Sequence, residues 1–211
     1  QRMKRNYSLA VIAAVLIFAI GSWIFVANQN DVKIRFDRAK EVWRGQEYFR
    51  SAQLFLELVR LYPRSKLADD ALWEAATTHY LNLYDIPTAI KYFEQLTEEY
   101  PDSPMAPEAH KYLAEISDKD LNEPASAVLH WQSALAYDIP REEAAEIRLW
   151  MGDALFKQEK ISQAEQQYEL VRREAVEEEQ VCQALLRLGL VFQVRKQYLE
   201  SIEAFREVVG N

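Results

Sequence analysis

The sequence predicts an all-α protein, in which one N-terminal transmembrane helix is followed by an α-solenoid of about five helix pairs. Three observations support this fold class. The 211 residues include only 5 glycines and 7 prolines, too few for a sheet protein that turns every ~10 residues. Apolar residues make up 49% of the chain, which supports a packed core and excludes a disordered protein. Sequence landmarks also recur at intervals of about 37 residues, as expected for a repeat protein.

The first predicted element is a membrane-spanning helix over residues 7–27, preceded by a basic flank at 1–6. These 21 residues carry no charge, and as a helix they reach about 30 Å, the thickness of a bilayer core. The apolar region of a cleaved signal peptide is usually shorter, so we expect a retained anchor. Ala10, Ala14 and Gly21 are small residues that would allow close packing against another spanning helix, although a plain lipid-facing anchor is equally consistent.

Charge around this span favours one orientation. Arg2, Lys4 and Arg5 precede it without any acidic residue, whereas the basic residues that follow it are mixed with Asp31 and Asp37. Positive residues tend to remain on the cytoplasmic side. We therefore expect the inner (cytoplasmic) membrane, with the N-terminus in the cytoplasm and residues 28–211 in the periplasm, although the number of Lys and Arg on the two flanks is similar.

Composition also limits the partners. The chain has a net charge of −8, and the basic flank means that the remainder is more acidic still. Nucleic-acid binding needs clusters of Lys and Arg, so we expect no nucleic-acid partner. The single cysteine excludes a disulfide framework within one chain.

Residues 28–211 are predicted to form one repeat domain. A small residue stands four positions before a large apolar residue in five places, and the small residues are 37, 38, 37 and 37 positions apart. The pairs are Ala52 and Leu56, Ala89 and Phe93, Ala127 and Trp131, Ala164 and Tyr168, and Ser201 and Phe205. They divide the domain into repeats at about 31–65, 66–103, 104–140, 141–176 and 177–211.

Each repeat is expected to contain two antiparallel helices, A and B. A small residue lets helices approach closely, and a large residue one turn later fills the neighbouring groove. Gly152 and Gly189 stand twelve residues before Ala164 and Ser201, which places them on A helices of the same register. Tyr-Pro pairs end two B helices, and the serines that follow, Ser65 and Ser103, are expected to cap the next A helix, with Pro104 as its first residue.

These landmarks resemble the tetratricopeptide repeat. The resemblance lies in the Gly152 and Gly189 positions, the small-to-aromatic spacing of helix B and the proline that ends it, and it covers about 31–211. The interval of 37 differs from the usual 34 of the family. The Tyr-Pro-Asp-Ser turn beginning at Tyr100 is similar to turns in bacterial envelope proteins with such repeats. The resemblance implies an α-solenoid whose A helices line a concave, protein-binding face.

That implied face supplies the candidate partner-binding residues. Each of them alternatively serves only as a solvated surface group. They are His79, Tyr80, Asn82, Tyr84, Lys111, Arg148, Lys157 and Arg187.

No pattern points to catalysis or a cofactor. The sequence lacks glycine-rich phosphate loops, Cys-x-x-Cys-His and nucleophile-elbow motifs, so we expect no enzyme, cofactor or metal. His79, His110 and His130 lack the spacing of metal ligands, and Cys182 has no neighbouring base in its helix.

The resulting hypothesis is a membrane-anchored scaffold for other proteins. One version is a stable accessory subunit of an integral-membrane complex, held through both the anchor and the repeats. The alternative is a transient periplasmic chaperone or envelope coordinating factor that binds clients on its concave face. Binding of a small ligand and self-assembly through the C-terminal end remain open.

Overall fold

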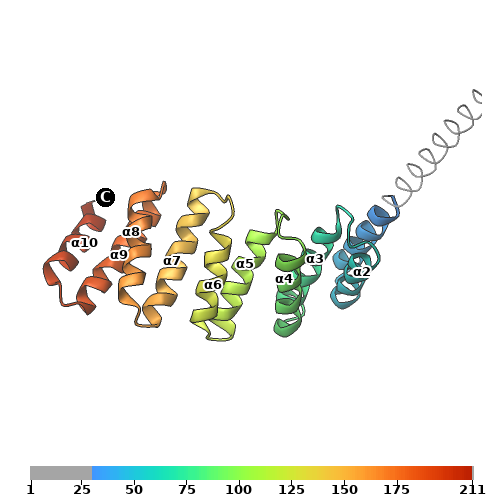
Figure 1. Cartoon of the computed structure of the whole chain (residues 1–211), viewed down its shortest axis with the longest axis horizontal. Coiled ribbons are helices and arrows are strands. Elements are labelled where there is room, and N and C mark those ends of the chain that lie inside the picture. Colours follow the sequence, from blue (N-terminus) through green and yellow to red (C-terminus); the bar gives the residue numbers. More distant parts are fainter. Residues whose placement is uncertain (1–29, 211) are drawn as a thin grey trace, which may run out of the picture. The chain divides into compact units, whose positions relative to one another are not determined.

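The computed structural model describes residues 30–210, which form helices joined by short turns (Figure 1). The predicted flank 1–6, the predicted span 7–27 and its small residues Ala10, Ala14 and Gly21 lie outside the described residues. Within 30–210, no helix combines the length and apolar character needed to cross a bilayer. The all-α prediction is confirmed for the described residues, which contain about ten helices and no strand.

The chain divides into two compact units, residues 1–89 and 90–211. In the first unit, residues 30–44 are helical and are followed by α2 (Tyr48–Leu61) and α3 (Ala68–Leu81). Helix α4 (Ile86–Glu99) begins in the first unit and ends in the second. The second unit continues with α5 (Ala106–Glu115), the π-helical turn η1 (Ile116–Asp120), α6 (Pro124–Ala134), α7 (Arg141–Lys157), α8 (Ile161–Glu174), α9 (Glu178–Val194) and α10 (Tyr198–Gly210).

In the second unit, each helix packs against the next one along the chain, and successive helices alternate in direction (Figure 1). Helix α7 also contacts α9, so the A helices of neighbouring repeats meet directly. The core between these layers consists of fully buried small residues alternating with large ones. The small residues include Ala127, Ala154, Ala164 and Ala184, and the large ones include Trp131, Ile147, Tyr168 and Leu188.

Contacts of the glycines confirm the predicted fit between the two helices of a repeat. A Cβ atom built on Gly152 would lie 2.3 Å from Cε1 of Tyr168, and one on Gly189 would lie 2.4 Å from Cε1 of Phe205. In both repeats the aromatic ring of helix B therefore rests on the backbone of helix A, and only glycine leaves room for it.

The first repeat has a different register from the predicted one. The small residue of helix B comes three positions after the first residue of α4, α6, α8 and α10, and the same position in α2 is Ser51. Ser51 Oγ donates a hydrogen bond to the carbonyl of Ala39, as Ser201 Oγ does to that of Gly189. The pairing of Ala52 with Leu56 was therefore wrong by one residue, because the Ser51 hydroxyl bonds to a carbonyl of the preceding helix and its small side chain fills the buried position.

The turns between helices A and B share one backbone feature. A non-glycine residue with positive φ stands two positions before each helix B, namely Gln46, Tyr84, Asn122, Glu159 and Lys196. In the fourth repeat the turn closes with the N–H of Lys160 bonded to the carbonyl of Leu155, five residues back, as in a Schellman motif.

In the second and third repeats the corresponding bond reaches six residues back, from Asp85 to His79 and from Glu123 to Ser117. These two turns hold one extra residue. With the register corrected to Ser51, the small residues of helices B are 38 positions apart between the first and second and between the second and third repeats. The later intervals are 37 positions.

The predicted caps at Ser65 and Ser103 also need correction. The structure begins α3 at Ala68 and α5 at Ala106, so Pro104 precedes the helix. Ser103 Oγ accepts a hydrogen bond from the N–H of Met105, and Ser65 Oγ accepts one from Leu67. Each serine thus stabilises a turn that precedes the helix.

Candidate protein-binding grooves

The second unit contains a groove of about 390 Å³ between the A helices of the third and fourth repeats. We call it the aromatic groove, because Tyr112, Trp131 and Trp150 line it. Trp131 is buried, whereas Trp150 is 41% exposed and presents an apolar ring to solvent. Charged side chains form the rest of the lining, namely Glu108, Lys111, Glu115, Asp118, Lys119, Asp153 and Lys157.

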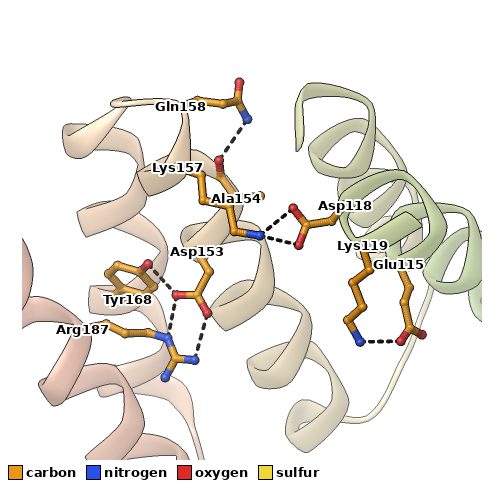
Figure 2. A network of polar contacts seen from close by, with 9 residues as sticks. All are labelled: Glu115, Asp118, Lys119, Asp153, Ala154, Lys157, Gln158, Tyr168 and Arg187. Carbon is orange, nitrogen blue, oxygen red and sulfur yellow. Dashed lines mark hydrogen bonds and ion pairs between the residues drawn. The ribbon is translucent and has the colours of Figure 1, made fainter. Parts of the chain in front are cut away.

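Ion pairs across the aromatic groove join neighbouring A helices (Figure 2). Lys157 Nζ on α7 donates to both carboxylate oxygens of Asp118 on η1, at 2.9 and 2.8 Å. Lys111 Nζ on α5 donates to Glu108 at 2.6 Å and to Glu143 of α7 at 2.9 Å. Burial opposes the charge of Lys111, but the hydrogen bonds to both carboxylates outweigh it and raise the pKa of Lys111.

Asp153 also lines the aromatic groove, and its carboxylate accepts hydrogen bonds from two other helices. Its two oxygens accept hydrogen bonds from Arg187 Nε at 2.7 Å and Arg187 Nη2 at 2.9 Å, so α7 and α9 are joined by a bidentate pair (Figure 2). Tyr168 Oη on α8 donates a further bond to Asp153 at 2.8 Å. Hydrogen bonding to Asp153 raises the pKa of Arg187, and burial raises the pKa of Tyr168.

The structure therefore brings together two of the predicted binding residues, Lys111 and Lys157, in one groove. Arg187 contacts the groove through Asp153. Arg148 lies on a different part of α7 and lines a separate groove with Arg141 and Arg173. Binding of a partner protein by these residues stays a prediction.

The predicted residues of the second repeat lie in the first unit and differ in exposure. Tyr84 is 82% exposed and takes the positive-φ position of its turn, and Asn82 follows the last residue of α3. Tyr80 is half-buried. His79 is only 5% exposed, with Nδ1 3.3 Å from Asp85, so the expectation of an exposed histidine was wrong. Its position facing the turn could not be read from helical spacing alone.

The other histidines form a small cluster in the second unit. The rings of His110 and His130 are 5.8 Å apart, and Tyr137 lies 6.0 Å from His110. Burial and the charge of His130 lower the pKa of His110 to about 4, and burial lowers the pKa of His130. In the described part of the chain, no three His, Cys, Asp or Glu residues are grouped so that they could hold a metal ion.

Sequence reasoning missed the acidic partners and the exposed ring of the groove. Asp118, Asp153 and Trp150 were not among the predicted residues. The sequence did contain a signal for Trp150. It stands next to Leu149 and two positions before Gly152, both on the packed face of helix A, so it is expected at the edge of that face. Asp118 gave no such signal, because it belongs to a π-helical turn that the apolar pattern does not predict.

Comparison with known proteins agrees with this architecture. Tetratricopeptide repeat models match residues 70–103, 117–177 and 151–211, together more than half of the chain. The chain belongs to the tetratricopeptide repeat family. No curated protein matches the sequence. Tetratricopeptide repeat proteins are generally non-catalytic scaffolds that bind other proteins.

Solved structures share the tetratricopeptide repeat fold at low identity. MamA from Desulfovibrio magneticus RS-1 (residues 41 to the end) is 16% identical to this chain, with a TM-score of 0.61. The match covers 85% of this chain and 93% of the MamA chain. YrrB, described as a TPR protein with an unusual peptide-binding site, is 15% identical, with 83% and 84% coverage and a TM-score of 0.62. These similarities show that the described residues have the fold of tetratricopeptide repeat proteins.

Proposed function

We propose that this protein is a non-catalytic, membrane-anchored scaffold that holds a segment of another protein in the aromatic groove. The observation that carries the proposal is the exposed ring of Trp150 on a groove of about 390 Å³ that two repeats build together. Exposed aromatic rings beside satisfied polar groups are typical of residues that contribute most to protein interfaces. YrrB, a protein of similar fold, is described as having a peptide-binding site, which agrees with this use of the fold.

The charges of the groove suit a partner that contains both basic and apolar residues. Four carboxylates and three lysines line the groove, so its lining is slightly acidic, as is the whole chain. The pairs Lys119–Glu115 and Lys157–Asp118 have exposed lysines and contribute little individually, so a basic residue of the partner can replace either lysine at low cost. An aliphatic or aromatic residue would then cover Trp150.

The membrane anchor over 7–27 is part of this proposal. The predicted span ends at residue 27 and the predicted repeat domain begins at residue 28, which would hold the scaffold at the bilayer surface, next to integral-membrane partners. We propose that the repeats face the periplasm. A Val209→Cys variant in a Cys182→Ser background tests this, because Val209 is 88% exposed. Labelling of intact cells by a membrane-impermeant maleimide supports the orientation, and labelling only after lysis refutes it.

Copurification of the full chain in mild detergent tests the scaffold role. A stable subunit retains one fixed set of membrane proteins across a salt series, whereas the alternative chaperone role gives varied, salt-labile clients. Trp150→Ala is expected to remove the bound proteins in either case. Trp43→Ala is the matched control, because Trp43 is similarly exposed but lies in the first unit. Equal recovery of partners with both variants would contradict the role of the aromatic groove.

A further inference from the structure

We infer that a second groove, lined by three arginines, binds a segment of a partner protein in which acidic and aliphatic residues alternate. This arginine groove has a volume of about 410 Å³ and lies where the start of α7 meets the end of α8. Arg141 and Arg148 come from α7, and Arg173 comes from the last turn of α8. The site does not depend on the aromatic groove, with which it shares no lining residue.

The three arginines lack the carboxylate partners that most other arginines of this unit have. Arg172, Arg187 and Arg195 each pair with a carboxylate at 3.5 Å or less. Within the described residues, no ion pair or hydrogen bond engages the side chains of Arg141, Arg148 or Arg173. Acidic residues outnumber basic ones by 33 to 25, so carboxylates are plentiful in this chain. Three arginines without an ion pair among the described residues therefore line one groove.

The arrangement of these cations suits carboxylates. Arg141 and Arg148 are seven residues apart, so they share one face of α7 about 10 Å apart along its axis. A guanidinium binds a carboxylate through two parallel hydrogen bonds, which favours arginine over lysine for such contacts. Glu174 is the only acidic residue in the lining, which leaves an excess of positive charge to attract an anionic segment.

The walls between the arginines are apolar. Ile139 and Leu170 line the groove and are half-buried, and Val171 forms its buried floor. Aliphatic side chains of a ligand would bury these surfaces while its carboxylates meet the guanidiniums. A phosphate backbone would leave the apolar walls unused and would be repelled by the acidic remainder of the protein. Charge complementarity therefore favours an acidic–aliphatic protein segment.

Fluorescence anisotropy of a labelled Leu-Glu-Ile-Glu-Leu amide peptide, titrated with the full chain, tests this inference. We expect the wild-type chain to bind the peptide and Arg148→Gln to weaken binding by about tenfold, with Arg148→Gln/Arg173→Gln weaker still. Arg206→Gln is the matched control, because Arg206 is exposed on α10 and has no ion pair in the described residues. It is expected to bind like the wild type. Circular dichroism verifies that each variant is folded.

Each of the following results would overturn the inference. One is that the Leu-Gln-Ile-Gln-Leu amide binds as tightly as the glutamate peptide. Another is that the double arginine variant binds the glutamate peptide as the wild type does. A further one is that an oligothymidylate of eight nucleotides binds more tightly than the peptide and depends on the arginines. Loss of binding in Trp150→Ala would place the peptide in the aromatic groove instead, and would also refute the site. Comparison with the free-acid form of the peptide distinguishes two carboxylate sources. Stronger binding of the free acid assigns the site to a chain terminus, and equal binding assigns it to side chains.

Discussion

The close approach of Tyr168 to Gly152 makes the substitution Gly152→Ala a direct test of the packing within a repeat. The added Cβ would lie 2.3 Å from Cε1 of Tyr168, whereas carbon atoms in contact are normally about 3.5–4.0 Å apart. The ring would have to retreat by more than ~1 Å. It is 2% exposed, and its hydroxyl is bonded to Asp153, so it has no free space to enter.

The magnitude follows from three contributions to the free energy of unfolding. Overpacking of a filled core costs about 1–3 kcal/mol. Displacement of the ring also breaks the hydrogen bond from Tyr168 to Asp153, at a cost of about 1 kcal/mol. Alanine in place of glycine within a helix returns about 1 kcal/mol. We therefore expect Gly152→Ala to destabilise the protein by about 1–3 kcal/mol.

Urea denaturation of the full chain, followed by circular dichroism, measures this effect. Gly210→Ala is the control, because a Cβ there meets no atom within 4 Å, and its stability should change little. Gly189→Ala should cost less than Gly152→Ala, because its neighbour Phe205 is half-exposed and can move. Addition of Tyr168→Leu to Gly152→Ala should recover part of the loss. Equal stability of the Gly152 and Gly210 variants would refute the packing argument.

Three further predictions concern stability. Burial and the charge of His130 lower the pKa of His110 from 6.5 to about 4. The folded state therefore binds fewer protons than the unfolded state, and the free energy of unfolding should fall as the pH drops from 6.5 to 4. Denaturation measured across this pH range should show a weaker dependence in His110→Phe. Glu159→Gly should raise the denaturation midpoint by relieving about 1 kcal/mol of left-handed strain at φ 59°, whereas Gln166→Gly within α8 should lower it by a similar amount. Ala164→Trp should cost several kcal/mol by overpacking a fully buried position, and unchanged thermal unfolding would contradict the repeat register.

The regular part of the fold could be predicted because it depends on periodic residue size. Ala89, Ala127 and Ala164 are fully buried, as their recurrence indicated. The register of the first repeat could not be obtained from size alone, because Ser51 and Ala52 are both small and both buried. The hydrogen bond of Ser51 to Ala39 decides between them, and it depends on a neighbouring helix.

The candidate sites were predicted only in part, for a related reason. Lys111 and Lys157 were found because they are polar residues on A helices. Their partners Glu143 and Asp118 are 32 and 39 residues away in sequence, and no fixed interval relates the two pairs. Arg148 was likewise identified from its helix, but its convergence with Arg173 depends on how the end of α8 packs against α7.

The ion pairs of the aromatic groove have a consequence for how it can bind. Lys111–Glu143 and Lys157–Asp118 join the A helices of the third and fourth repeats, and Arg187–Asp153 joins those of the fourth and fifth. Together these three pairs restrict the spacing of successive A helices. A partner that competes for Asp118 displaces the exposed Lys157 and makes a contact of the same kind, while the buried core preserves the repeat packing. The groove can thus accept a charged partner without a large loss of stability, because its polar lining and its packed core are separate.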